Sequence, residues 1–297
     1  MLLVTGITGH TGSYFLQELI NNSFKGPIRC IVRESSDTSL IDSSGLNIEK
    51  VVGNLSDKQF MLKITKDVDT VLHIAGIQKT LNVIEAAVTN GVRRGILVHT
   101  TGIYSQFKSA SEEYKHVEDE MHRLINSDSA NLNITILRPT MIYGDMSDLN
   151  MSKFVKMVDK LRIFPVIDNG SSLIQPVNAR DLGRAYFQIL TKSGEIKSEY
   201  VLSGEKPISM LEAFRIIGNC LGKKTFFINC PLPVGVILAR ILKTLTLGEI
   251  DFVERVQRMG ENRSFSHEDA QQDFEFNPIP FSQGISIEIE QYKKNRF

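Results

Sequence analysis

The stretch MLLVTGITGHTGSYFLQELI (residues 1–20) contains three glycines, Gly6, Gly9 and Gly12, between an apolar run and an amphipathic run. The residues before Gly6 are apolar and partly β-branched, which is typical of a short buried strand. The residues after Gly12 repeat apolar side chains at helical spacing, which is typical of an amphipathic helix. The stretch therefore predicts a strand, a tight glycine turn and a helix.

This predicted turn has the features of a phosphate-binding loop. A glycine at the end of a strand allows positive φ, and a second one lets backbone N–H groups approach a phosphate closely. The positive end of the helix dipole favours the same anion. The spacing G-x-x-G-x-x-G thus predicts a dinucleotide site, and the alternative is a structural turn without a ligand. The expected cofactor contacts in the loop are Gly6, Thr8, Gly9, His10, Thr11 and Gly12.

Strand-like and helix-like runs alternate through the first half of the chain. Apolar strands that alternate with helices predict a parallel sheet covered on both faces, a doubly wound α/β (Rossmann) fold. The expected strands are residues 2–6, 28–33, 48–54, 69–76, 95–101 and 133–139. The expected helices between them include residues 13–20, 57–65, 79–91 and 111–125.

The alternation loosens after about residue 145, which predicts a smaller C-terminal substrate lobe. We expect a dinucleotide-binding domain at 1–145, to which 172–202 returns, and a lobe formed by 146–171 and 203–297. The most hydrophobic later stretch is LPVGVILARILKTLTL (residues 232–247), which is too short to span a bilayer comfortably. We interpret it as a packed helix; the alternative is a helix that faces a partner or a membrane surface.

Composition limits the class of partner. The 297 residues contain 34 Lys and Arg against 34 Asp and Glu, so no global field attracts nucleic acid. The three cysteines, Cys30, Cys220 and Cys230, have neither metal-type spacing nor a paired framework. We therefore expect no metal, no integral membrane association, a small-molecule substrate and a reducing, cytoplasmic location.

The end of the second expected strand indicates the cofactor. In NAD-binding proteins an acidic residue there accepts a hydrogen bond from the ribose 2′-hydroxyl. Here the segment reads CIVRESS, and Arg33 occupies this region. An arginine can pair with a 2′-phosphate, so we predict NADP. NAD stays open because Glu34 follows directly.

Five segments in order, GITGHTG, VLHIAG, HTTGIY, ILRPTMIYG and IQPVNARDLGRA, give the chain a family resemblance. It resembles the short-chain dehydrogenase/reductase superfamily, in its extended or atypical branch of NAD-dependent epimerases and dehydratases and NmrA-like reductases. The resemblance implies an NAD(P)-dependent oxidoreductase or an epimerase/dehydratase-like enzyme acting on a nucleotide-activated sugar. It is also compatible with a homodimer formed through helices at 79–90 and 111–126.

The resemblance also implies site residues. Further cofactor contacts are expected at Asn54, Leu55, His73, Ile74, Ala75, Gly76, Pro139 and Thr140. Substrate contacts are expected at Tyr104, Tyr143, Asn150, Gln175 and Asn178. Among three basic residues near the end of the lobe, one or more could meet a diphosphate or form a solvated helix face: Arg255, Arg258 and Arg263.

Hydride transfer in this superfamily uses a Ser or Thr, a Tyr as general acid/base, and a Lys one helical turn after the Tyr. The resemblance implies Thr100 or Thr101 for the hydroxyl residue and Tyr114 for the tyrosine. The residue four positions after Tyr114 is Glu118, where the family has Lys. A carboxylate there would oppose ionisation of the tyrosine, although it could accept hydrogen bonds from a ribose.

Two other lysines near Tyr114 in the sequence could supply the ammonium that the family's lysine provides. Lys115 follows Tyr114 directly and points about 100° around the helix. Tyr104 and Lys108 have the literal Tyr-x-x-x-Lys spacing, but they fall in the loop after the fifth strand, so we interpret this match as accidental. The alternative function is a catalytically weak or inactive NAD(P)-binding sensor or assembly protein.

Overall fold

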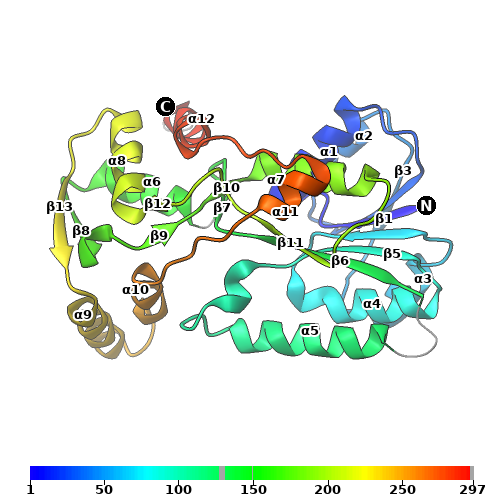
Figure 1. Ribbon diagram of the computed structural model, residues 1–297, viewed down its shortest axis with the longest axis horizontal. Helices are drawn as coiled ribbons and strands as arrows, with labels where there is room; N and C mark the ends of the chain where they lie inside the picture. Colours follow the sequence, from blue (N-terminus) through cyan, green and yellow to red (C-terminus); the bar gives the residue numbers. More distant parts are fainter. Residues whose placement is uncertain (127–130, 149, 295–297) are drawn as a thin grey trace.

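The computed structural model describes residues 1–126, 131–148 and 150–294. Its centre is a seven-stranded parallel sheet in the order β11-β6-β5-β4-β1-β2-β3 (Figure 1). The strands are β1 (Leu2–Thr5), β2 (Ile28–Val32), β3 (Ile48–Val52), β4 (Thr70–His73), β5 (Arg94–Val98), β6 (Asn133–Pro139) and β11 (Glu199–Leu202). This is the doubly wound α/β fold that the alternating pattern predicts.

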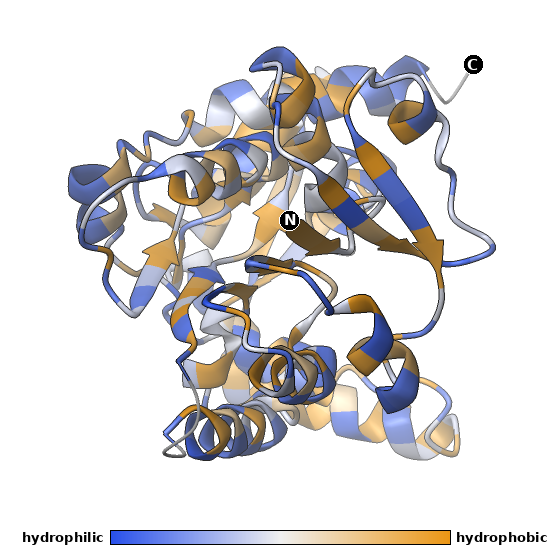
Figure 2. Cartoon of the chain, turned by 90° about the vertical axis from the view of Figure 1, so that its right-hand side faces the viewer, coloured by the Kyte–Doolittle hydropathy of each residue, from blue (hydrophilic) through white to orange (hydrophobic). Residues whose placement is uncertain are grey.

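Helices cover both faces of the sheet because the central strands are apolar on both sides. One face carries α1 (His10–Asn21), α7 (Ala179–Thr191) and α11 (Glu268–Phe274); the other carries α3 (Lys58–Ile64), α4 (Thr80–Thr89) and α5 (Ser111–Ile125). The short helix α2 (Ser39–Asp42) follows β2. Figure 2 shows the apolar central strands between helices with hydrophilic outer surfaces. Two separate hydrophobic cores result, one on each side of the sheet.

The strand order reverses between β1 and β4, which are neighbours in the sheet. In open α/β sheets, ligands bind outside the carboxyl ends of the strands at such a switch point. The glycine loop follows β1 at this edge. Three short 3-10 helices complete the loops: η1 (Ile77–Lys79), η2 (Thr101–Tyr104) and η3 (Asp168–Gly170).

The remaining elements gather at one end of the molecule (Figure 1). Three two-stranded sheets pair β7 (Ile142–Tyr143) with β10 (Val177–Asn178), β9 (Leu173–Ile174) with β12 (Ile208–Ser209), and β8 (Ile163–Ile167) with β13 (Phe226–Cys230). The helices are α6 (Met151–Lys160), α8 (Met210–Leu221), α9 (Leu232–Leu245), α10 (Val253–Met259) and α12 (Phe281–Lys294). A third apolar core lies between α6, α8, α12 and β8.

All six expected strands are present, and the seventh, β11, was not predicted. The prediction of a packed helix at 232–247 is half wrong. Residues 232–245 do form α9, but α9 buries its small residues, Gly235 and Ala239, and exposes large apolar ones. No helix in the described residues is long and apolar enough to cross a bilayer.

Candidate cofactor and substrate sites

The glycine loop between β1 and α1 requires residues without a Cβ. Gly6 has φ +76°, and a Cβ there would lie 2.9 Å from the backbone nitrogen of Ala75. A Cβ on Gly12 would lie 2.1 Å from the Gly6 carbonyl oxygen. The loop therefore folds tightly against the end of β4, and α1 packs close to β1, as the dinucleotide fingerprint demands.

The N-terminus of α1 is left open toward the loop. Its first residue is His10, its N-cap is Gly9, and among the described residues no side chain caps it. The first turn also lacks an acidic residue. Free N–H groups and the helix dipole at such an end favour a bound anion. This arrangement fits the pyrophosphate of a dinucleotide.

A cavity of about 1030 Å³ adjoins this helix end. That volume is at the upper end of the range of small-molecule and cofactor sites. The predicted cofactor residues that line it are Gly6, Thr8, Gly9, His10, Thr11, Arg33, Asn54, Leu55, Ile74, Ala75 and Gly76. The lining also includes residues that sequence reasoning missed, namely Ile31, Val32, Glu34, Ser35, Ser36, Val52, Gly53, Lys79 and Ile142.

Four predicted cofactor residues do not line this cavity: Gly12, His73, Pro139 and Thr140. His73 is fully buried, with Nδ1 2.7 Å from the Thr5 hydroxyl and Nε2 3.0 Å from the Gly76 carbonyl. Burial, with a smaller effect of nearby His99, lowers the pKa of His73 to about 4, so its ring is neutral. His73 thus holds the strand end that borders the cavity.

The far end of the cavity carries two cations. Arg33 follows β2, and its backbone N–H donates to the Ser36 hydroxyl at 3.1 Å. Lys79 enters from η1 and donates to the Ser56 hydroxyl at 2.7 Å. The side-chain oxygen of Asn54 accepts a hydrogen bond from the Ser56 N–H at 2.9 Å. Among the described residues that line the cavity, Glu34 is the one with a carboxylate.

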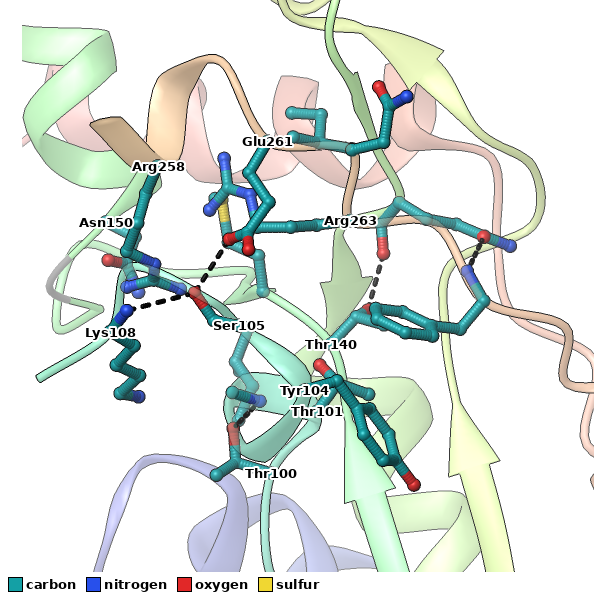
Figure 3. Close-up of a pocket in the computed structure, with 17 residues that line it drawn as sticks. Thr100, Thr101, Tyr104, Ser105, Lys108, Thr140, Asn150, Arg258, Glu261 and Arg263 are labelled. Atoms are coloured by element: carbon teal, nitrogen blue, oxygen red, sulfur yellow. Dashed lines mark hydrogen bonds between the residues drawn. The ribbon is translucent and has the colours of Figure 1, made fainter. Parts of the chain in front are cut away.

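A second cavity, of about 270 Å³, lies beside the first, and Ile142 lines both. Its wall includes six of the predicted catalytic, cofactor and substrate residues: Thr100, Thr101, Tyr104, Thr140, Asn150 and Gln175. The other lining residues are Gly102, Ser105, Lys108, Met141, Ile174, Arg258, Glu261, Asn262, Arg263 and Phe265. Figure 3 shows Lys108, Asn150 and Arg258 on the same side of this cavity.

The three threonine hydroxyls in this cavity differ in whether their proton is already used in a hydrogen bond. Thr101 donates to the Pro139 carbonyl at 3.2 Å, and Thr140 donates to the Gln175 carbonyl. Thr100 instead accepts from the Gly102 N–H at 3.0 Å. Of these three threonines, Thr100 is the one whose hydroxyl donates to no partner in the described part of the chain, so its proton can be offered to a ligand.

Tyr114 lies in the first turn of α5 and is 8% exposed. It packs with Ile77, Ile103 and Val117 and is not among the residues that line the second cavity. The ammonium of Lys108 lies 4.8 Å from the centre of the Tyr114 ring. Lys108 thereby bridges Tyr114 and the cavity.

Glu118 does not face a cofactor ribose. It is buried and accepts hydrogen bonds from both terminal nitrogens of Arg138, at 2.6 and 2.7 Å. The Nδ1 atom of His99 lies 2.7 Å from the same carboxylate. Burial raises the pKa of Glu118, but the hydrogen bonds from His99 and Arg138 outweigh burial and hold that pKa at about 2. The expectation that Glu118 is open to ribose hydroxyls is therefore corrected.

Tyr104 is tied to the same charged network. Its hydroxyl donates to Glu199 at 2.6 Å, and Arg138 donates to Glu199 at 2.8 Å. Burial and this hydrogen bond raise the pKa of Tyr104 to about 12. Figure 3 shows the hydroxyl pointing away from Lys108, so the Tyr104–Lys108 spacing does not form a proton-transfer pair.

Two predicted substrate residues lie outside both cavities. Tyr143 is fully buried against Phe281, at 5.2 Å between ring centres. Asn178 is the N-cap of α7, and its side chain accepts from the Arg180 N–H at 3.0 Å. Asp181, in the first turn of the same helix, accepts from the Ile279 N–H at 2.9 Å. Gln175 does line the second cavity, but its amide bonds to Gly204 and Phe265.

The second cavity has an excess of positive charge. Arg258 and Arg263 both line it, and the buried Nε atom of each has no hydrogen-bond partner within the described part of the chain. Burial and the neighbouring Arg258 lower the pKa of Arg263 to about 10. The acidic lining residue Glu261 is already engaged by the Ser105 hydroxyl and the Gln106 N–H. Arg255 does not line the cavity and lies over the Phe252 ring.

The loop after β7 contacts the first turns of α1, next to the glycine loop. Asp145 accepts from the Tyr14 hydroxyl at 3.0 Å, and His10 Nε2 lies 3.1 Å from the same carboxylate. Arg180 donates to the adjacent Gly144 carbonyl at 2.6 Å. The segment between the two cavities is thus fixed to the helix end at which the phosphates are expected.

Fold and cavity together define a dinucleotide-binding α/β protein. Residues 6–153 match the family of NAD(P)H-binding domains, and this part of the chain belongs to that family. Festuclavine synthase I of Penicillium roqueforti (strain FM164) is 25% identical over 141 residues. The match covers 48% of this chain and 45% of that relative, so it spans less than half of the curated protein.

Solved structures share the whole fold. The protein gox2253 has a TM-score of 0.77 and 20% identity, covering 99% of this chain and 98% of its own. The dTDP-glucose 4,6-dehydratase DesIV from Streptomyces venezuelae, with NAD and TYD bound, has 0.73 and 18%, covering 99% and 97%. The UDP-glucuronic acid 4-epimerase from Bacillus cereus, with UDP-glucuronic acid and NAD, has 0.73 and 18%, covering 99% of both chains. The chain therefore has the fold of the extended short-chain dehydrogenases/reductases, as its motifs predict.

Proposed function

We propose that this protein is an NADP-dependent oxidoreductase or epimerase that acts on a nucleotide-activated sugar. The observation that carries the proposal is the pair of adjoining cavities that share Ile142. The first has the open helix end that a dinucleotide requires. The second is lined by Arg258 and Arg263, whose Nε atoms have no hydrogen-bond partner in the described residues, and a phosphate-bearing ligand there would lie next to the first.

The diphosphate of the substrate would bind between Arg258 and Arg263. The two neighbouring guanidinium groups repel each other, and their buried Nε atoms, which have no hydrogen-bond partner in the described residues, offer donors to an anion. A diphosphate offsets this repulsion, whereas a neutral substrate does not. Structures of this fold hold UDP-glucuronic acid or a thymidine nucleotide beside NAD, which supports the same class of ligand.

The nicotinamide would exchange a hydride with a carbon that carries a hydroxyl or carbonyl group. Thr100 keeps a free hydroxyl proton, and this side chain would orient the substrate oxygen. Lys108 lines the cavity and would supply the ammonium that the family places one turn after the tyrosine. It would also connect the cavity to Tyr114, the predicted acid/base, whose ring centre is 4.8 Å from the Lys108 ammonium. A Cβ on Gly102 would lie 2.8 Å from Lys108 Nζ and 3.2 Å from Thr100 Oγ1, so both groups lie against the same glycine.

Calorimetry with NADPH and NADH, followed by a panel of UDP-, GDP- and dTDP-sugars, tests the proposal. We expect tighter binding of NADPH, and then turnover of at least one sugar nucleotide followed by nicotinamide absorbance or product chromatography. NADPH binding without turnover of any sugar nucleotide would favour the sensor or assembly alternative. Absence of binding of either cofactor to folded protein would remove both.

The arginine pair has a matched control. Arg258→Met with Arg263→Met should weaken sugar-nucleotide binding by about tenfold or more, because charge-assisted hydrogen bonds contribute about 1.5–3 kcal/mol. NADPH affinity should not change. Arg255→Met removes a nearby arginine that does not line the cavity and should leave both affinities unchanged. Equal losses of sugar-nucleotide binding in the double variant and in Arg255→Met would contradict a diphosphate site.

A further inference from the structure

Helix α9 turns its large apolar side chains toward solvent, whereas a helix packed on its own chain buries them. Its buried face carries the small residues Gly235 and Ala239. Its exposed face carries a stripe at helical spacing, with exposed fractions between 37% and 77%: Val234, Ile237, Leu238, Ile241, Leu242 and Leu245. A helix that packs only within its own chain turns such a stripe inward.

The apolar surface continues beyond α9. Leu247, Ile250 and Phe252 follow it and are 95%, 40% and 41% exposed. On β13, Phe226 and Ile228 are 70% and 54% exposed, and Ile163 on β8 lies opposite Phe226 in the pairing register. Figure 1 shows β8, β13 and α9 at the end of the molecule away from the large sheet. Patches of this kind mark surfaces that another body covers.

The charge of this face is positive on balance. The chain as a whole is neutral, but residues 223–252 contain Lys223, Lys224, Arg240 and Lys243 against Glu249 and Asp251. Lys243 is paired with Asp251 and Lys223 with Asp159. Arg240 forms no ion pair within the described residues. Basic side chains beside a stripe of Leu, Ile and Val are typical of helices that lie in the plane of an anionic lipid surface.

The alternative cover, a second copy of this chain, fits the charge less well. A two-fold pairing brings the same patch of both subunits together. Each copy would then set the net positive charge of its face against that of the other, since the face has four basic residues and only two acidic ones, Glu249 and Asp251. Anionic headgroups instead complement these cations, and long basic side chains reach headgroups while their stems stay apolar.

We propose that the face formed by α9, the Leu247–Phe252 segment and the β8/β13 edge binds the surface of an anionic membrane. With 14 residues, α9 is about 21 Å long, less than the hydrocarbon core of about 30 Å, so it lies on the bilayer and does not cross it. The cofactor domain would then face away from the lipid. This binding surface is separate from both cavities and does not depend on the proposed reaction.

Flotation of the full chain with phosphatidylcholine vesicles, with and without phosphatidylglycerol, tests the surface. We expect flotation only with the anionic vesicles, and its loss at high salt. Ile237→Glu with Ile241→Glu should reduce the bound fraction at least tenfold, and Arg240→Gln should weaken binding about fivefold. Leu40→Glu changes an apolar residue with a similar degree of exposure on α2 and should bind as the parent does.

Each variant is checked for folding by its thermal midpoint and by NADPH binding, which the proposal leaves unchanged. Failure of the folded parent to float with anionic vesicles would overturn the proposal. So would a stable dimer, measured by light scattering, that Ile237→Glu with Ile241→Glu converts to monomer while vesicles bind neither form. That result would assign the surface to a second copy.

Discussion

The guanidinium of Arg138, on β6, donates two hydrogen bonds of 2.6 and 2.7 Å to the carboxylate of Glu118, on α5. Because His99, directly after β5, and Glu199 on β11 join the same network, one cluster ties the helix to three neighbouring strands. Glu118 therefore holds α5 on the sheet. Glu118 occupies the sequence position of the family's lysine, but its side chain holds α5 against the sheet and does not face the cofactor.

Restoring the family's residue at this position should harm the protein. Glu118→Lys would place an ammonium against Arg138 and leave a buried charge unpaired, which costs about 3–5 kcal/mol of unfolding free energy. Turnover should not rise. Urea denaturation measures the loss, and Glu113→Lys, an exposed change on the same helix, should stay within about 0.5 kcal/mol of the parent. A stable Glu118→Lys protein with higher activity would show that the carboxylate is misassigned.

Lys108 is expected to supply the ammonium that position 118 lacks. Lys108→Met should lower kcat/KM about a hundredfold, the usual size of a lost proton-transfer partner, and should change the pH dependence of the rate. NADPH affinity should change less than about twofold, since no cofactor contact is removed. The control is Lys115→Met, because Lys115 is paired with Glu112 on the surface. Full activity in Lys108→Met would exclude this lysine.

The glycine loop was predictable because its geometry is local. A strand end, a glycine with positive φ and the start of a helix lie within a dozen residues, so spacing alone locates them. The site residues after β2 and β3 follow from the same rule, since carboxyl ends of parallel strands meet at one edge. Asn54 and Thr100, which the family resemblance implied, follow β3 and β5 at this same edge.

The Glu118 network was not predictable from spacing. Its members come from α5, β6, β11 and the residue after β5, and only the strand order brings Glu199 beside Arg138. Lys108 is similar, because the loop before α5 folds back over Tyr114 and no periodic pattern reports such a return. Tyr143 and Asn178 were predicted as substrate contacts, but they line neither cavity. A motif locates the segment that borders a site and does not tell which of its side chains face the cavity.

Cofactor choice should depend on Arg33. Arg33→Ala should weaken NADPH binding about tenfold to a hundredfold, because a guanidinium–phosphate contact contributes about 1.5–3 kcal/mol. NADH lacks the 2′-phosphate and should bind with unchanged affinity. Calorimetry with both nucleotides measures the two constants, and Arg123→Ala, on the outer face of α5, serves as the control. Equal changes for NADPH and NADH would remove Arg33 from the 2′-phosphate site.

The stability of the protein should fall as the pH rises, because of Glu288 on α12. Its side chain is fully buried and accepts from the Gly144 N–H at 2.9 Å. Burial first, then the nearby Asp148 carboxylate, raise the pKa of Glu288 to about 9, so the folded protein keeps a proton there that the unfolded chain releases above about pH 4.3. The folded state binds more protons across this range, and the free energy of unfolding therefore decreases toward alkaline pH.

Glu288→Gln should remove this decrease, because the amide resembles the protonated acid and carries no charge at any pH. Thermal midpoints measured between pH 7 and 8 avoid the titration of His73, which stays neutral when folded and whose contribution ends near pH 6.5. Over that interval the midpoint of the parent should fall relative to that of Glu288→Gln. Glu290→Gln, exposed on the same helix, should follow the parent. Parallel curves for the parent and Glu288→Gln would mean that Glu288 is ionised in the folded protein.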